Sequence, residues 1–375
     1  MKNKIKNPRE QKSLSTLDSE KSTMIISNSF LLKKKNNTKT LLIIISIILL
    51  IIIFVFSFII KHKDINMNKN HYNKLQIIYQ NKNTTINYFS NTFNFDFEYH
   101  NYERDFITDK MKKYAEWQLE HNEPYFLNGI IRKFKPKKCL EIGVAKGGSS
   151  IIILNAIKDI KDSFLISMDL NIKFYQNETE ETGYNVKRYF PELTENNKWQ
   201  LFTGEQPNIF LDRLNLKYDF LFLDTVHLTP GELINIIEAL PFLEENAIVV
   251  LHDIVFHLHD YYITPEVKYF PSQIYLMTSL AGNKVAIQDD NFGTENIGAV
   301  FLHPHQETYY LNYFFLLLSP WEYIPTDKHI DELRSFISKY YKEEIYLKIF
   351  NTAVNHAKKY INKVDSFKNA YGFKK

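Results

Sequence analysis

The stretch that decides the fold is Lys138-Cys-Leu-Glu-Ile-Gly-Val-Ala-Lys-Gly-Gly-Ser-Ser150, an apolar strand followed by a glycine-bearing turn and the start of a helix. Gly143 stands where the strand ends and allows a sharp turn, because glycine adopts backbone angles that other residues avoid. Gly147 and Gly148 remove side chains where a ligand would approach backbone N–H groups at a helix N-terminus. One of the two serines that follow is expected to cap the helix. The stretch predicts a nucleotide-like ligand on a parallel sheet.

Short apolar runs then alternate with helical patterns along the chain. The predicted strands are Cys139–Ile142, Phe164–Met168, Trp199–Phe202, Phe220–Leu223, Ile248–Leu251, Val285–Gln288 and Ile297–Leu302. The predicted helices between them lie near 148–160, 207–215 and 230–243, and the tail adds Asp331–Tyr341 and Glu344–Ile361. This alternation predicts an α/β fold with a doubly wound, Rossmann-like, mostly parallel sheet of about seven strands.

Polar residues near the first two strand ends suit a nucleoside. Asp169 follows Gly143 by 26 residues and ends the second strand, where a carboxylate can bind both hydroxyls of a ribose. Glu141 is placed to accept hydrogen bonds from an ammonium or hydroxyl group. A dinucleotide enzyme would show Gly-x-Gly-x-x-Gly, and Ala145 replaces the second glycine. Use of a nicotinamide cofactor is therefore disfavoured.

Two later strands end in acids and histidines. The fourth runs into Asp224 and His227, and the fifth ends in His252-Asp253. Carboxyl ends of neighbouring parallel strands meet at the ligand-binding edge of the sheet. Asp224 and Asp253 thus form a half-site for a hard divalent ion, which prefers carboxylate oxygens. Without a metal, His227 is the expected general base, since an unperturbed imidazole has a pKa of about 6.5.

Glu-Ile-Gly-Val-x-x-Gly-Gly-Ser, with these strand-end acids, resembles class I S-adenosylmethionine-dependent methyltransferases over roughly residues 120–305. The similarity is greatest to sugar, macrolide and polyketide O-methyltransferases and the cephalosporin-hydroxylase-like proteins. The resemblance implies S-adenosylmethionine as cofactor, an optional Mg²⁺ on Asp224 and Asp253, and catalytic roles for Asp224, His227 and His252. The cofactor residues that it implies are Glu141, Gly143, Gly147, Ser149, Asp169, Gly204, Glu205 and Asp224.

The sequence departs from metal-dependent relatives at two positions. Some relatives carry an acid where Val226 stands, and some carry Asp or Asn where Ile254 stands. The metal site is therefore incomplete in sequence. His257, His259 and Asp260 follow closely, but their apolar and aromatic neighbours favour a connector or substrate lid over a second metal site.

Composition excludes several classes of protein. The net charge of +3 arises from 46 basic and 43 acidic residues, a balance that argues against a nucleic-acid partner. The single cysteine, Cys139, permits no intramolecular disulfide and lies among apolar residues, as a buried strand residue would.

The twenty residues 41–60 contain no charge, proline or glycine and are long enough to span a bilayer. We expect a single-pass membrane helix there. Basic residues of the tail favour an inner N-terminus, whereas the cytosolic origin of S-adenosylmethionine favours an inner catalytic domain, so the side stays open.

The expected organisation is a disordered basic tail (1–40), the membrane helix, a stalk (61–100), a methyltransferase domain (101–305) and a C-terminal helical extension (306–375). The predicted function is O-methylation of a hydroxyl on a sugar, glycan-like or other small-molecule acceptor. Two alternatives remain: a hydroxylase-like or nucleotide-sugar-modifying relative on the same fold, and a non-catalytic, membrane-tethered binding module.

Overall fold

The structure is a computed structural model, and it describes residues 107–116, 118–119, 122–255, 272–287 and 296–370, together with a short strand at 93–94. The predicted membrane span, the basic tail and the group His257, His259 and Asp260 lie outside the described residues. No helix within the described ranges is both long and apolar enough to cross a membrane. Tyr88–Lys375 forms one compact unit.

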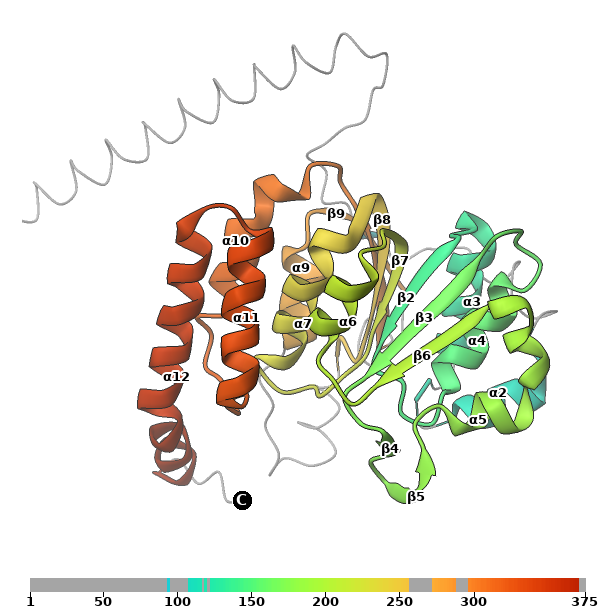
Figure 1. The fold of residues 1–375 in the computed structure, drawn as a ribbon, viewed down its shortest axis with the longest axis horizontal. Coiled ribbons are helices and arrows are strands. Elements are labelled where there is room, and N and C mark those ends of the chain that lie inside the picture. Colours follow the sequence, from blue (N-terminus) through green and yellow to red (C-terminus); the bar gives the residue numbers. More distant parts are fainter. Residues whose placement is uncertain are drawn as a thin grey trace, which may run out of the picture. The chain divides into compact units, whose positions relative to one another are not determined.

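The unit is built on an eight-stranded sheet in the order β1-β9-β10-β8-β7-β2-β3-β6 (Figure 1). Strands β8, β7, β2, β3 and β6 run parallel to one another, and β10 is antiparallel to β8 and β9. The bounds are β1 Phe93–Asn94, β2 Lys138–Ile142, β3 Phe164–Asp169, β6 Trp199–Thr203, β7 Tyr218–Leu223, β8 Leu243–His252, β9 Gly282–Ala286 and β10 Ile297–Leu302. The predicted doubly wound, mostly parallel sheet is confirmed.

Helices cover both faces of this sheet because its strands are apolar on both sides. Cys139 of β2 faces one core with Leu165 of β3, while Leu140 faces the other with Ile166. The first core is covered by α2 (Asp109–Ala115), α3 (Glu123–Phe134), α4 (Gly148–Ile157) and α5 (Tyr184–Tyr189). The second is covered by α6 (Pro207–Leu214), α7 (Gly231–Ala239) and α9 (Ser272–Ser279).

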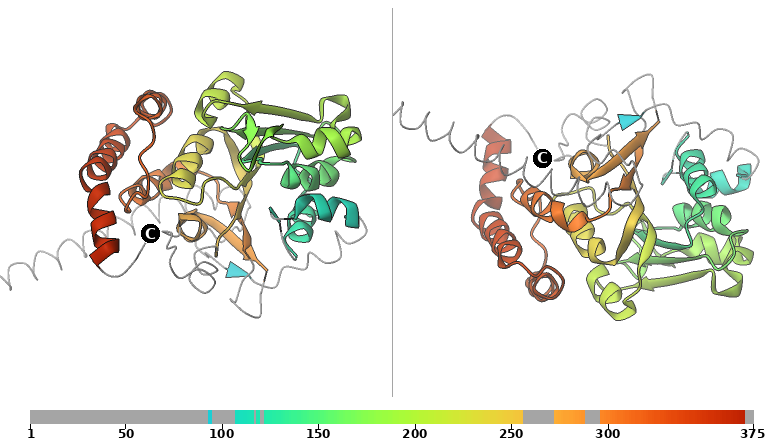
Figure 2. Two further views of the ribbon diagram at one scale, coloured as in Figure 1. Left: turned by 90° about the horizontal axis from the view of Figure 1, so that it is seen from below. Right: turned by 90° about the horizontal axis from the view of Figure 1, so that it is seen from above.

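The C-terminal extension packs on the second face of the sheet. It comprises α10 (Tyr310–Leu316), α11 (Asp327–Tyr340) and α12 (Glu344–Ala370). Helices α11 and α12 form an outer layer beyond α6 and α7 (Figures 1 and 2). Tyr313, Trp321 and Phe350 are buried in the same core as the strands. The extension and the sheet therefore share one hydrophobic core.

The predicted strands overlap the observed ones, although β8 and β9 begin earlier than predicted, at Leu243 and Gly282. The sequence did not indicate helices α5 and α9 or the hairpin after β3. The strands of this hairpin are β4 (Lys173–Phe174) and β5 (Asn177–Glu181). Most of β5 is exposed and charged, so it carries no apolar alternation from which a strand could be predicted.

The order in which strands are added to the sheet reverses between β2 and β7. From β2 the chain continues to β3 and β6 on one side, whereas β7 and β8 lie on the other. Ligands bind in open α/β sheets at the carboxyl ends of the strands beside such a switch point. The predicted site residues at the ends of β2, β3, β7 and β8 all lie along this edge.

Candidate active site

Gly143 joins the cofactor loop to the catalytic edge. Its φ of +93° lies in the left-handed region, and a Cβ built on it would lie 1.6 Å from the carbonyl oxygen of Asp224. The Asp224 N–H donates to the carbonyl of Ile142 at 3.0 Å. The close approach of β2 and β7 therefore requires a glycine, and the predicted turn at Gly143 is confirmed.

Protein atoms fill the space beside the next two glycines. A Cβ on Gly147 would lie 2.9 Å from a methyl carbon of Val186, and one on Gly148 would lie 2.7 Å from Oε1 of Gln118. Helix α4 begins after Gly147 without a side-chain cap, so the predicted serine cap is wrong. These glycines admit α5 and the segment after α2. Contact of Gly147 with a cofactor stays a prediction.

Several N–H groups of the loop already have acceptors within the chain. Oδ2 of Asp169 accepts from Val144 at 2.9 Å and from Ala145 at 3.0 Å. Oε1 of Gln118 accepts from the N–H of Gly148 at 2.7 Å, and its Nε2 donates to the carbonyl of Val144 at 3.0 Å. Gln118 bridges the two ends of the loop, a role for which the sequence gives no sign.

Glu141 lies beneath the loop and is fully buried. Its carboxylate accepts from the hydroxyls of Ser149 and Ser150, both at 2.6 Å, and from Ser167 at 2.5 Å. Burial raises the pKa of Glu141 to about 7, although the three hydroxyls oppose the shift. Both Glu141 and Ser149 thus anchor β2, β3 and α4 to one another, and their contact with a cofactor stays a prediction.

The predicted ribose and adenine residues lie together at the ends of β3 and β6. The carbonyl of Asp169 accepts from the N–H of Gly204 at 3.2 Å. Gly204 has a φ of +91° and packs against Ile172 of the segment leading into the hairpin. Glu205 is exposed and pairs with Arg213 at 3.1 Å. Their roles in binding ribose and adenine stay predictions.

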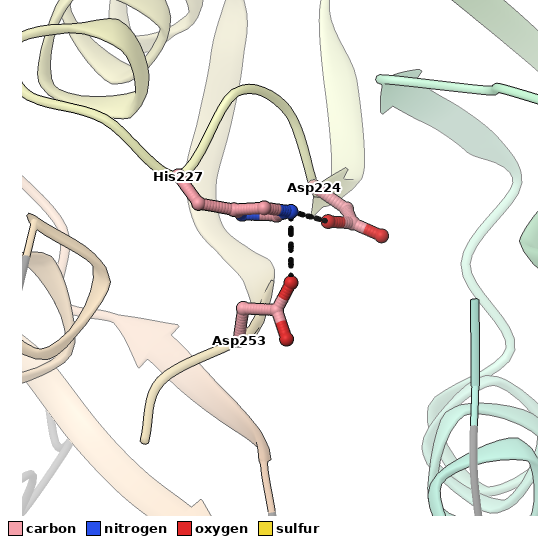
Figure 3. A group of neighbouring side chains, drawn as sticks. All are labelled: Asp224, His227 and Asp253. Carbon is pink, nitrogen blue, oxygen red and sulfur yellow. Dashed lines mark ion pairs between the residues drawn. The ribbon is translucent and has the colours of Figure 1, made fainter. Parts of the chain in front are cut away.

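Asp224, His227 and Asp253 meet at the neighbouring strand ends (Figure 3). Nε2 of His227 lies 2.9 Å from Oδ2 of Asp253 and 3.6 Å from Oδ1 of Asp224. Each of the three residues offers one atom that can bind a metal, and these three atoms all lie within 4.8 Å of one another. The predicted convergence of the two strand ends is confirmed, and His227 lies between the two carboxylates.

The expectation of an unperturbed His227 is wrong. Burial lowers the pKa of the imidazole, but Asp253, Glu232 and Asp224 outweigh burial and raise it well above its ordinary value. Burial opposes ionisation of the Asp253 carboxyl and would raise its pKa. His252 and His227 outweigh burial, so the pKa of Asp253 lies well below its usual range. The surrounding carboxylates therefore favour the protonated form of the His227 imidazole, and the neutral form is the one that can act as a base.

His252 connects this cluster to a carboxylate that the sequence did not single out. Its Nε2 lies 3.1 Å from Oε2 of Glu123, a buried residue in the first turn of α3. Its buried Nδ1 makes no hydrogen bond among the described residues and lies 3.3 Å from Oδ2 of Asp224. An acid in the first turn of a helix is common, so the sequence signal for Glu123 was weak.

Further polar residues support the loop after β7. Glu232 of α7 accepts from the backbone N–H of His227 and from the side chains of Ser272 and Gln273. Nε2 of Gln273 also lies 2.9 Å from Nδ1 of His227. Asn296, just before β10, donates to Oδ1 of Asp253. Glu232 is near His227 in sequence, whereas Ser272, Gln273 and Asn296 are distant, and only the fold brings them to the site.

The residues at the cluster fit a divalent cation. Two carboxylates and one imidazole converge, which is a common donor set for such ions. The apolar side chains of Val226 and Ile254 offer no ligand atoms, so these two positions do not complete the metal site. Asp224 and Asp253 are therefore the residues that would hold Mg²⁺, with His227 as the nearest nitrogen.

Comparisons with known proteins identify the part of the chain that carries this site. Residues 140–254 match a family described as a methyltransferase domain. The chain contains a methyltransferase domain. The predicted methyltransferase domain is thereby confirmed over these residues. The matched residues begin in β2 and end after β8, so they include the glycine loop, Asp169 and the Asp224–His227–Asp253 cluster.

No curated protein matches the sequence significantly. Among solved structures, the O-methyltransferase TomG from Streptomyces achromogenes, in complex with S-adenosylmethionine, is 16% identical, with 55% of this chain and 99% of that chain covered and a TM-score of 0.40. The O-methyltransferase from Bacillus cereus, in complex with S-adenosylhomocysteine, is 12% identical, with 54% and 99% covered and a TM-score of 0.39.

Proposed function

We propose that this protein transfers the methyl group of S-adenosylmethionine to a hydroxyl oxygen of a sugar, a glycan-like molecule or another small molecule. The observation that carries the proposal is the cluster of Asp224, His227 and Asp253 directly beside the glycine loop. The loop and the cluster meet where Gly143 approaches Asp224. A cofactor on the loop would therefore lie close to groups that can orient an acceptor and remove its proton.

The loop favours a nucleoside cofactor without phosphates. Dinucleotide enzymes bind a pyrophosphate on free N–H groups at the helix N-terminus. Here Asp169 and Gln118 accept from the N–H groups of Val144, Ala145 and Gly148. S-adenosylmethionine carries no phosphate, and its sulfonium cation suits surroundings rich in carboxylates. The nucleotide-sugar-modifying alternative is disfavoured for the same reason.

The reaction is an in-line displacement at the methyl carbon. The acceptor oxygen attacks that carbon, the carbon–sulfur bond breaks, and S-adenosylhomocysteine leaves with the sulfur electron pair. The hydroxyl proton passes to a base, for which neutral His227 is the best-placed side chain. Asp224 and Asp253 hold the imidazole in position from two sides. Alignment of the two substrates contributes much of the acceleration, as in other two-substrate reactions.

Bound Mg²⁺ would supply positive charge that favours loss of the acceptor proton and orients neighbouring oxygens of the acceptor. Asp224 and Asp253 are the residues to hold it. Positive charge at this position would also reduce the influence of the two carboxylates on His227. Asp224 and Asp253 therefore have a role in both forms of the site: they would hold the ion when it is bound, and they hold the His227 imidazole when the ion is absent.

We further propose that residues 41–60 anchor the chain in a membrane. Their uncharged, apolar sequence supports this placement, and a membrane tether would suit a lipid-linked acceptor.

Isothermal titration with S-adenosylmethionine and S-adenosylhomocysteine tests the cofactor, and absence of binding by both would overturn the proposal. Transfer of labelled methyl from S-adenosylmethionine to a membrane glycan extract tests the reaction. Asp224→Asn and His227→Gln should each reduce transfer by roughly 10²-fold. A chain that binds the cofactor but gives products unchanged by either substitution would support the non-catalytic alternative instead.

A further inference from the structure

The loop that carries His227 is held at both of its flanks by groups outside the sheet. This loop, residues 224–230, joins β7 to α7. His227 has a φ of +53°, in the left-handed region that is costly for a residue with a side chain. Such a conformation persists only when its surroundings fix it.

The first contact involves Thr229 and the segment between α10 and α11. The N–H of Thr229 donates to Oε2 of Glu322 at 2.9 Å, and the N–H of Glu322 donates to the carbonyl of Thr229 at 2.8 Å. The Thr229 hydroxyl donates to the carbonyl of Pro320 at 2.6 Å. Thr229 is fully buried. Glu322 thus accepts from the N–H of Thr229 with its carboxylate and donates to the carbonyl of Thr229 with its own N–H.

The second contact begins two residues before His227. The hydroxyl of Thr225 donates to Oδ1 of Asn235 at 3.0 Å, and Nδ2 of Asn235 donates to Glu238 at 3.0 Å. The other oxygen of Glu238 lies 3.4 Å from Nε2 of His329 in α11. Asn235, Glu238 and His329 are all buried. This chain of polar groups links the loop, through α7, to the C-terminal extension.

A glycine allows these parts to approach. A Cβ on Gly231 would lie 2.2 Å from a methyl carbon of Val226 and 3.1 Å from the hydroxyl oxygen of Tyr323. The loop, the start of α7 and the extension are therefore in contact at this point. Movement of the extension would displace the backbone next to His227.

We propose that the C-terminal extension positions the base of the reaction, and that Glu322 is a positioning residue for His227. The proposal rests on the proposed function, because it assigns His227 a role in methyl transfer. Glu322 does not touch the cofactor loop: its bonds are to the loop after β7, whereas the cofactor loop is held by Asp169 and Gln118. Loss of Glu322 should therefore slow transfer without weakening cofactor binding.

The test compares Glu322→Ala, Glu322→Gln and a matched control, Glu332→Ala, in the full chain. Glu332 belongs to the same extension and pairs with Lys328 along α11. We expect Glu322→Ala to reduce labelled methyl transfer to the membrane glycan extract by about 10-fold to 100-fold, as small misplacements of catalytic groups do. The dissociation constant for S-adenosylmethionine should stay within about twofold. Glu322→Gln keeps an acceptor for Thr229 and should restore most of the transfer.

Hydrogen–deuterium exchange of the peptide covering residues 224–231 gives a readout that needs no acceptor. Faster exchange there in Glu322→Ala, with exchange of residues 140–150 unchanged, supports positioning even if the wild-type chain transfers no methyl. Unchanged exchange, or transfer equal to that of Glu332→Ala, overturns the proposal. Equal losses of cofactor binding and transfer also overturn it, since they indicate a general structural role.

If Glu322→Ala fails to fold, Thr229→Val decides the question. It removes the hydroxyl bonds to Pro320 and Glu322 and keeps the two backbone bonds. Reduced transfer with unchanged cofactor affinity supports the proposal, and transfer equal to wild type overturns it.

Discussion

At the scale of single residues, Glu141 makes a pH dependence of stability testable. Its pKa is raised by burial from 4.5 to about 7. Between these values the folded chain holds a proton that the unfolded chain has lost, so the free energy of unfolding falls as the pH rises. The contribution is fully present below pH 4.5 and lost above about pH 7, a difference of roughly 3 kcal/mol.

Glu141→Gln should remove this dependence, because the amide does not titrate. Denaturant unfolding at pH 5 and pH 8 measures it. The variant should lose less stability than the wild type between the two values. An equal loss in both proteins would show that Glu141 titrates normally in the folded chain.

Gly143 is the residue where the fold tolerates substitution least. A methyl group there would overlap the backbone of Asp224 and would occupy a φ of +93°. We expect Gly143→Ala to cost at least ~3 kcal/mol in unfolding free energy and to abolish binding of S-adenosylmethionine. Gly204→Ala is the matched control. Its φ is +91°, but its Cβ would meet only the flexible side chain of Ile172 at 3.0 Å.

Denaturant unfolding separates the two glycine variants. Gly204→Ala should cost about 1 kcal/mol, the backbone strain alone. Equal costs in the two variants would mean that the approach of β2 to β7 is not what requires glycine at position 143.

At the scale of elements, the segment after α2 is expected to influence the cofactor loop. Gln118 bridges the carbonyl of Val144 and the N–H of Gly148, and it fixes the loop before a ligand binds. Gln118→Ala should weaken S-adenosylmethionine binding from a few-fold to about 10-fold, the worth of about one hydrogen bond. Lys113→Ala, an exposed change on α2, should leave the affinity unaltered. Isothermal titration measures the affinity of both variants. Equal affinities in Gln118→Ala and Lys113→Ala would show that Gln118 does not contribute to cofactor binding.

The sequence predicted the strands well because each is a short apolar run bounded by polar residues. It also predicted which strand ends meet, because parallel connections leave Asp224 and Asp253 at one edge. It did not predict that Gly147 and Gly148 admit neighbouring helices, since packing partners come from distant segments. Gln118 was missed for the same reason. The altered pKa of His227 depends on Glu232 and Asp253 together, and no local pattern reports that arrangement.

At the scale of the whole molecule, the site depends on parts of the chain on both sides of the matched segment, residues 140–254. Glu123 precedes this segment and contacts His252, whereas Glu322 follows it and contacts Thr229. The matched segment, residues 140–254, therefore lacks groups that complete its own catalytic edge. The extension also supplies Tyr313 and Trp321 to the core that lies against β7 and β8. A chain cut after residue 305 would expose that core and should not fold.

The opposite truncation should be tolerated. Tyr88–Lys375 forms one compact unit and contains every residue of the site, so a chain of residues 88–375 should fold and bind S-adenosylmethionine. Its affinity should match that of the full chain within about twofold, because no site group is removed. If residues 41–60 anchor the protein, the full chain should sediment with membranes and the truncated chain should stay in the supernatant. Cell fractionation with titration of both proteins measures this. Full-length protein in the supernatant would contradict the anchor, whereas a truncated chain that fails to fold would contradict the independence of the unit.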